Sequence, residues 1–290
     1  ISEIVWRNPH IRVSFTVDGG TANEKIYTTE SNSVASLTRM EVTKELLAVG
    51  TVVRVAGYKS RTSDTDIFMN HLLLPSNREI VFLRTAEPRW PDSARLGTTA
   101  QLSGEVIEED FSKRPTSIFS AWINVYGDPG SHHTLLLNQP EWTEKGQQVA
   151  DLAAQAPEDS SCSPKAMPLV MDAPYPIALI DDGDTLTIHL EEYDSIRTVH
   201  MNVPHQDSGT AGILGYSTGR MIDGGLSVIT TFGEDSGMQI YETFHLSDDH
   251  NRLLYSQIVV DPEMRLTPTI NKKWWQYQPG ASVQPYECSY

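Results

Sequence analysis

The chain has 290 residues, of which 39% are hydrophobic and 21% are charged, the composition of a folded globular protein. Acidic residues outnumber basic residues by 38 to 22, and the net charge of −16 disfavours nucleic acids and anionic membrane surfaces as partners. No apolar run approaches the roughly 18 residues of a membrane helix, so no membrane insertion is expected, and the length favours two modest domains.

The first part of the chain predicts a small β domain. A helical pattern at 33–47 begins at a Ser cap. Strands are expected before and after it at 2–7, 10–17, 24–30, 51–59 and 66–74. Three strands, one helix and two strands is the order of a five-stranded OB-like barrel. The Pro-containing stretch 87–91 predicts a linker, which places the domains at 1–90 and 91–290.

The rest of the chain predicts a larger antiparallel meander. Ile107 and residues 117–126 look strand-like, 141–155 predicts a helix, and the Ser- and Pro-rich stretch 157–176 is expected to be irregular surface chain. Further strands are expected at 177–180, 185–193, 198–202, 226–232, 238–246 and 252–260. Such a meander closes into a barrel or folds into a sandwich. The predicted class is therefore all-β, a small OB-like barrel followed by a larger antiparallel barrel or sandwich.

The two cysteines, Cys162 and Cys288, lie in no spacing that is typical of a metal or thiol redox site. They form either a disulfide or two buried thiols. A bridge would join positions 126 residues apart and contribute about 4–5 kcal/mol by loop entropy. Because the sequence opens at Ile1 without an initiator Met, we also expect a mature or trimmed product.

Ionisable residues gather in one predicted hairpin. Glu191 and Glu192 end one strand. Arg197 and His200 start the next, and His205 follows in the loop. A carboxylate, a cation and imidazoles suit general acid–base chemistry at a cavity mouth, whereas a solvated hairpin with Glu–Arg pairing is the alternative. Because strand neighbours point to opposite faces, one of the two glutamates is expected to be buried beside Arg197 and the other exposed.

Other motifs carry weaker signals. The Gly-x-Ser-x-Gly pattern at 215–219 is also found in the nucleophile elbow of hydrolases, which needs a helix after it. Here a strand is expected to follow, so the pattern favours a tight turn. His10 after Asn8-Pro9 suits either an acid–base or metal role or a structural turn. No two histidines are spaced for one helix face, so no metal and no cofactor is expected. The candidate ligand contacts are Trp122, Tyr216, Arg220 and Trp274.

The N-terminal part resembles a family of small secreted β domains. That family carries a Trp-x-Asn-Pro-His motif, present here at 6–10, followed by a Gly-x-x-Val-x-Val-x-Gly strand, present at 50–57. The resemblance covers about residues 1–85. It implies an exported protein and a β fold of the OB-like kind.

The C-terminal part, about residues 140–290, resembles a second family of bacterial exported proteins of unknown function. The resemblance rests on six short motifs. They are Cys-Ser-Pro at 162–164, Pro-Tyr-Pro at 174–176, Glu-Glu at 191–192, Gly-x-Ser-x-Gly-Arg at 215–220, Asp-Pro at 261–262 and Tyr-Glu-Cys at 286–288. Residues 117–123 are also similar to the opening strand of lipocalin-like barrels. Members usually carry Asp-Gly-Arg near 202–204, His at position 216 and Trp-Glu-Gly at 221–223, which this chain lacks. The resemblance implies a periplasmic or secreted setting and the Cys162–Cys288 disulfide.

These patterns lead to two functional hypotheses. The first is an exported two-domain β protein whose C-terminal domain binds a small, partly apolar ligand, with the 191–205 hairpin near the cavity mouth. Conversion of that ligand is left open. The second is an interaction or assembly protein of the cell envelope, in which strand edges pair with neighbouring chains and no pocket chemistry occurs. The sequence indicates neither the ligand nor the oligomeric state.

Overall fold

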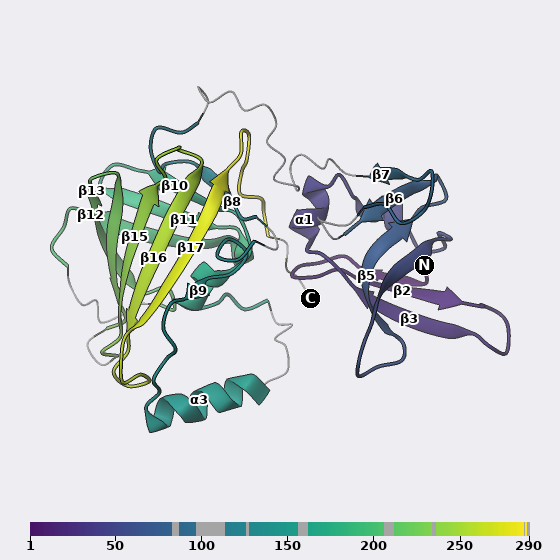
Figure 1. The fold of residues 1–290 in the computed structure, drawn as a ribbon, viewed down its shortest axis with the longest axis horizontal. Coiled ribbons are helices and arrows are strands. Elements are labelled where there is room, and N and C mark those ends of the chain that lie inside the picture. The colour runs from purple at the N-terminus through teal and green to yellow at the C-terminus, as the bar shows by residue number, and fades with distance from the viewer. Residues whose placement is uncertain are drawn as a thin grey trace. The chain divides into compact units, whose positions relative to one another are not determined.

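The computed structural model describes residues 1–82, 87–96, 114–125, 128–155, 162–205, 212–233, 236–286 and 288. Two compact units are present, Ile1–Ile107 with Tyr286–Tyr290, and Glu108–Pro285 (Figure 1). Both are built on β-sheets, so the all-β prediction is confirmed. The boundary lies beyond the predicted residue 90, because β7 (Ala94–Leu96) pairs with β6 (Arg78–Val81) in the sheet of the first unit.

The first unit is a curled, half-barrel sheet of seven strands. Its other elements are β1 (Glu3–Val5), β2 (Arg12–Val17), β3 (Lys25–Glu30), α1 (Val34–Arg39), η1 (Lys44–Leu47), β4 (Arg54–Lys59) and β5 (Asp66–Leu73). Pairing follows the path β1-β2-β3-β5-β4, with α1 after β3 and a parallel β3–β5 pair. This is the strand order expected for an OB-like domain, extended by β6 and β7.

The Asn-Pro-His motif joins three elements of the first unit. Asn8 is buried, and its Oδ1 accepts a hydrogen bond from Val34 N at the start of α1 at 3.0 Å. His10 Nδ1 lies 2.7 Å from Glu30 Oε1 at the end of β3. Ser33 caps α1, as predicted, because its Oγ accepts from Ser36 N. The motif therefore has a structural task at the junction of β2, β3 and α1.

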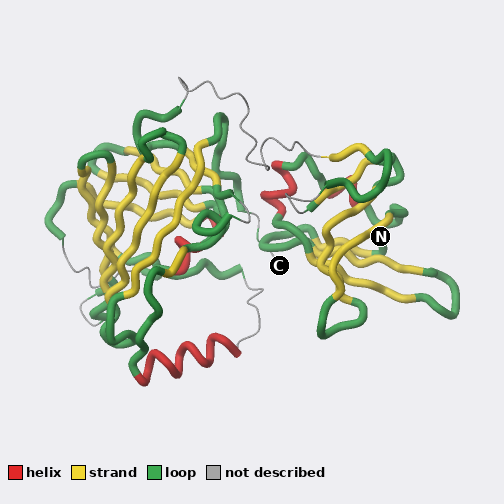
Figure 2. Tube along the Cα trace, viewed as in Figure 1, coloured by secondary structure: helices red, strands yellow, loops and turns green. Residues whose placement is uncertain are grey.

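The second unit is a closed barrel of nine strands (Figure 2). They are β8 (Ala121–Ile123), β10 (Ile177–Asp181), β11 (Thr185–Leu190), β12 (Ser195–Met201), β13 (Tyr216–Ile222), β14 (Gly225–Thr231), β15 (Gln239–Leu246), β16 (Arg252–Val260) and β17 (Thr269–Tyr277). The ring closes where β17 pairs with both β16 and β8. A ring with an odd number of strands cannot be antiparallel throughout, and β12–β13 is the parallel pair.

Strand alternation creates the interior of this barrel. Along β16, Leu253, Tyr255, Gln257 and Val259 are buried, while the residues between them are more exposed. The same period-two pattern in the other strands produces one apolar cluster that includes Trp122, Phe244 and Trp275. A short strand, β9 (Leu135–Leu136), pairs with β17, and the predicted helix is present as α3 (Glu144–Gln155). None of the helices in the described part of the chain is long and apolar enough to cross a membrane.

The stretch 157–176 differs from its prediction as irregular surface chain. Its described part contains the helical turn η3 (Leu169–Asp172), and Met167, Val170 and Met171 belong to the core of the barrel unit. These three side chains are buried because they pack against the barrel interior. We call residues 167–175 the closing segment. The predicted strand residues Ile107 and Tyr126, and residues 157–161, lie outside the described residues.

Cys162 and Cys288 form a disulfide, and no described cysteine is free. Of the two interpretations left open by the sequence, the disulfide is therefore the one that the structure contains.

Candidate functional site

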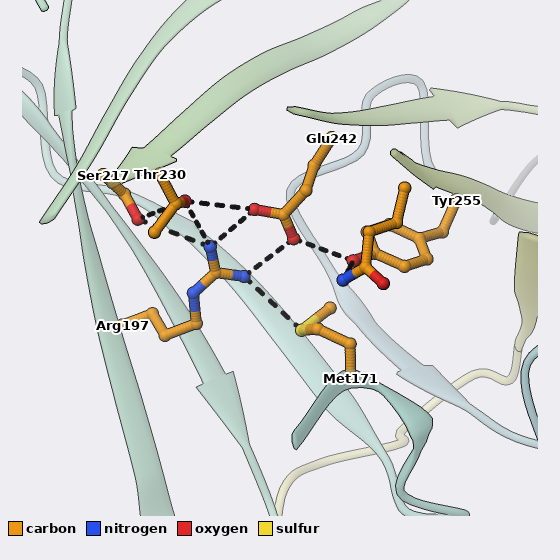
Figure 3. Close-up of polar contacts among 7 residues, drawn as sticks. Met171, Arg197, Ser217, Thr230, Glu242 and Tyr255 are labelled. Carbon is orange, nitrogen blue, oxygen red and sulfur yellow. Dashed lines mark hydrogen bonds and ion pairs between the residues drawn. The ribbon is translucent and has the colours of Figure 1, made fainter. Parts of the chain in front are cut away.

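A charged pair lies on the buried face of the barrel. Arg197 on β12 and Glu242 on β15 are 2% and 1% exposed. Their side chains meet in two hydrogen bonds, from Nη1 to Oε1 at 3.0 Å and from Nη2 to Oε2 at 2.6 Å (Figure 3). This two-point contact between guanidinium and carboxylate is the strongest geometry available to such a pair. The barrel interior therefore contains a buried ion pair.

Two hydroxyl groups complete one side of this pair. Nη2 of Arg197 donates to Ser217 Oγ on β13 at 3.3 Å and to Thr230 Oγ1 on β14 at 3.2 Å. Ser217 and Thr230 are register partners, and their hydroxyl oxygens are 2.9 Å apart. Thr230 also donates to Glu242 Oε2 at 3.3 Å. The hydroxyls thus form hydrogen bonds with both charged groups, and buried charges require such partners.

A chain of donors reaches Glu242 from the other side. Tyr255 on β16 donates its phenol proton to Glu242 Oε1 at 2.8 Å. Gln257 Nε2 donates to the Tyr255 oxygen at 2.8 Å, and Asn271 Nδ2 on β17 donates to Gln257 Oε1 at 3.0 Å. These residues, together with Arg197, Ser217 and Thr230, form what we call the polar layer. It runs without interruption from β12 to β17.

The protonation states in the polar layer follow from its geometry. Burial opposes the charge on Arg197, but the adjacent Glu242 carboxylate outweighs it and raises the pKa of Arg197 above its ordinary value. Burial and the same carboxylate raise the pKa of Tyr255 well above its usual value. At neutral pH the guanidinium is therefore charged and the phenol remains a donor. Among the described residues, the buried Nε of Arg197 has no hydrogen-bond partner, so one donor is unused.

The closing segment lies directly against the polar layer. Nη1 of Arg197 points at the sulfur of Met171, 3.4 Å away (Figure 3). Lys273 on β17 donates from Nζ to three consecutive carbonyl oxygens of the segment, those of Met171, Asp172 and Ala173, at 3.2, 2.9 and 2.6 Å. Met171 therefore sits between the two interior cations. Movement of the segment would uncover both.

Lys273 occupies an unusual position for a lysine. It is 2% exposed, and its Nζ lies 5.1 Å from the centre of the Trp275 ring. In the described part of the chain, no carboxylate forms an ion pair with it within 4.0 Å. Burial lowers the pKa of Lys273 to about 7, against the weaker opposing effects of Asp172 and Glu192. A strongly shifted ionisable group inside a barrel is typical of a functional site.

The pKa of Lys273 predicts a pH-dependent difference in stability between the wild type and Lys273→Met. The folded pKa is about 7, whereas an unfolded lysine titrates near 10.4. Between these values the unfolded chain binds more protons, so wild-type stability rises with pH relative to the variant, by about 3 kcal/mol from pH 7 to 9.5. Below pH 7 both states are protonated and the difference is constant. Urea denaturation of both proteins at several pH values measures this difference in the free energy of unfolding. A difference that does not change with pH would contradict the lowered pKa of Lys273.

The structure separates the residues of the predicted hairpin site. Arg197 points inward, while His200 lies three positions along the same strand and therefore faces outward, where its ring stacks on Tyr216 with centroids 4.8 Å apart. His205 is exposed, and its Nδ1 lies 2.8 Å from Thr218 Oγ1. Both imidazoles thus lie on the opposite face of the sheet from the polar layer.

The prediction that one of Glu191 and Glu192 is buried beside Arg197 and the other exposed is wrong. They are 0% and 3% exposed. β11 ends at Leu190, and Glu192 begins the helical turn η4 (Glu192–Asp194), so strand alternation does not apply to them. Glu191 accepts from Gln284 N at 2.9 Å and Glu192 from Lys165 Nζ at 2.8 Å. The carboxylate beside Arg197 is that of Glu242.

Of the predicted ligand contacts, only Trp122 lies in the barrel core, where its Nε1 donates to Ile118 O at 2.9 Å. Tyr216 is half-buried on the outer face, and Arg220 is exposed. Trp274 alternates with the buried Lys273 and Trp275, so it faces outward, under the guanidinium of Arg252 at 4.1 Å. Alternation along β13 and β17 is the physical reason for this division.

The Gly-x-Ser-x-Gly motif forms a strand, which corrects the expected tight turn. Ser217 lies within β13, with its hydroxyl in the polar layer. Gly219, two residues on, also faces inward, where a Cβ would lie 2.6 Å from Val199 Cγ1. That glycine allows β12 and β13 to approach as a parallel pair.

Sequence reasoning missed Glu242, Tyr255 and Lys273. Each has a signal in the period-two pattern. Glu242 lies in phase with Ile240 and Phe244, both buried. A charged residue in phase with apolar residues of a strand indicates a buried charge, and such charges need an interior partner.

No protein-family model, no curated protein and no solved structure matches the chain significantly. Within the described residues, no group of three or more His, Cys, Asp and Glu side chains is arranged to hold a metal ion. The fold and site define a closed nine-stranded β-barrel with a buried charged layer and a segment that closes over it.

Proposed function

We propose that the second unit binds one small, partly apolar ligand inside its barrel, with the polar end of the ligand at the polar layer. Barrels of eight or so strands are wide enough to hold one small ligand. The observation that carries the proposal is the buried Arg197–Glu242 pair, surrounded by the apolar cluster of the barrel. Polar and apolar surfaces inside one barrel match an amphipathic ligand.

A gain in stability does not explain why this ion pair is buried in the barrel. Removing two charges from water costs several kcal/mol each, and well-packed apolar residues in their place are often as stable or more stable. The unused Nε donor of Arg197 adds a further cost. A carboxylate or carbonyl oxygen of a ligand would satisfy that donor. We therefore assign the polar layer to recognition.

Entry would take place beneath the closing segment. Met171 occupies the position beside Arg197, and methionine is the most adaptable apolar side chain in a core. Leu169 of the same segment is exposed, so the segment reaches the surface of the unit. Displacing Met171 would open a path from solvent to the polar layer without breaking the strand ladder of the barrel.

The setting that supports this function is an exported one. Disulfides persist in oxidising compartments, and both cysteines of this chain are joined in a disulfide. A periplasmic or secreted binding protein fits the disulfide and the acidic composition.

A fluorescent polyene fatty acid tests the proposal. We expect saturable binding at one site per chain with a dissociation constant on the order of micromolar, which corresponds to a binding free energy of about −8 kcal/mol. Unlabelled fatty acid should displace the probe. Arg220→Met, on the outer face of β13, is the matched control and should bind like the wild type. The double variant Arg197→Met with Glu242→Leu removes both charges and should lose at least about tenfold in affinity.

Binding that does not saturate, or that is unchanged in the double variant, would contradict the proposal. One observation favours the alternative of an assembly protein. Tyr241, Ile258 and Ile270 are exposed register partners that form an apolar row across β15, β16 and β17. Under that alternative, sedimentation velocity would show oligomers that grow with protein concentration, and the probe would bind at no defined stoichiometry.

A further inference from the structure

We infer that Lys273 is a covalent attachment point, and that its amine forms an imine with the aldehyde group of a ligand inside the barrel. This inference rests on the proposed binding function and names the chemical class of ligand. It concerns a residue that the polar layer itself does not use.

The position of the amine supports this role. Lys273 lies on the buried face of β17 and is the register partner of Tyr255, next to the ring of Trp275. Its three hydrogen-bond acceptors are backbone carbonyls of the closing segment. When a ligand displaces this segment, the amine loses those acceptors and remains among aromatic side chains. Such surroundings disfavour the ammonium and favour the neutral, nucleophilic form.

The protonation state of Lys273 agrees with this geometry. Burial lowers its pKa to about 7, so near neutral pH about half of the amine is unprotonated. An exposed lysine with an ordinary pKa has a neutral fraction below about 0.1% at the same pH. Lys272, the preceding residue, is exposed on the outer face of the same strand. The two neighbours therefore provide a buried amine and an exposed one for comparison.

The reaction balances without any further reagent. The nitrogen lone pair attacks the carbonyl carbon, a carbon–nitrogen bond forms, and the carbonyl π electrons move to oxygen, which then takes one proton from the nitrogen. The resulting carbinolamine loses its hydroxyl group together with a proton from nitrogen, as water. The product is an imine, and no atom is oxidised or reduced. An apolar chain on the aldehyde would pack against the apolar cluster of the barrel.

The test uses the full chain with dodecanal and sodium cyanoborohydride, which reduces an imine to a stable secondary amine. We expect a mass increase of one dodecyl group per chain, mapped to the peptide that contains Lys273. Modification of Lys273 should be at least about tenfold faster than that of Lys272 at pH 7. Its rate should rise with pH through the neutral range, because burial lowers the pKa of Lys273 to about 7. Peptide mapping also separates Lys273 from the amino group of Ile1.

Variants distinguish this inference from the proposed function. Lys273→Arg and Lys273→Met should lose the fast modification, whereas Lys272→Arg, on the outer face, should keep it and still bind the fatty-acid probe. If dodecyl groups appear on exposed lysines while Lys273 stays unmodified and the probe binds, the imine inference is overturned and the binding function stands. If the probe does not bind the wild type, the binding function fails. Circular dichroism confirms that each variant is folded before it is scored.

Discussion

Arg197→Met is expected to lower the free energy of unfolding by about 3–5 kcal/mol. The substitution leaves the Glu242 carboxylate buried with its hydroxyl donors but without its cation. An uncompensated buried charge of this kind is among the largest single-residue costs in a folded protein. Urea denaturation of the wild type and the variant measures the change. A loss under about 1 kcal/mol would show that the pair is not ionised and buried as described.

Adding Glu242→Leu to Arg197→Met should restore stability to at least about the wild-type value. Both charges are then absent, so the cost of burying charge is removed. The exposed Arg220→Met is the matched control and should change stability by less than about 0.5 kcal/mol. If the double variant stays as unstable as the single one, the pair stabilises the barrel itself, and its assignment to recognition loses its physical basis.

Reduction of the Cys162–Cys288 disulfide should lower the free energy of unfolding by about 4–5 kcal/mol, because it releases a long loop in the unfolded chain. Intact mass after denaturation with a thiol-reactive tag should show no modified thiol without reductant and two with it. The double variant Cys162→Ser with Cys288→Ser should match the reduced wild type in stability. Two tagged thiols in the absence of reductant would refute the disulfide.

Much of the fold could be predicted from turn signals and alternation. Asp182-Gly183 and residues 223–225 mark tight turns, and the strands on either side of each are present. The prediction missed β6, β7, β9, β13 and β17, and for the last two the sequence shows why. β17 carries Asn271, Lys272 and Lys273 in succession, so polar residues fall on both of its faces. β13 directly follows Gly215 and contains Gly219, and glycines at this spacing favour a turn over a strand.

The candidate site was harder to predict, because its residues come from different strands. Glu191, Arg197 and His200 are close in sequence, but alternation and the end of β11 send their side chains in different directions. Arg197 and Glu242 meet inside the barrel although β13 and β14 lie between their strands in the ring. The register between strands is set by the whole barrel, and no local pattern encodes it.

Amide hydrogen exchange with and without the fatty-acid probe tests the central claim most directly, namely that the ligand lies in the barrel beneath the closing segment. Met167, Val170 and Met171 donate backbone hydrogen bonds within or next to that segment, so their exchange reports its position. We predict that the probe changes exchange in residues 167–175 and in β15 to β17, and that the double variant at Arg197 and Glu242 shows no such change. Changes confined to the first unit, or to the outer loops of the barrel, would contradict the claim.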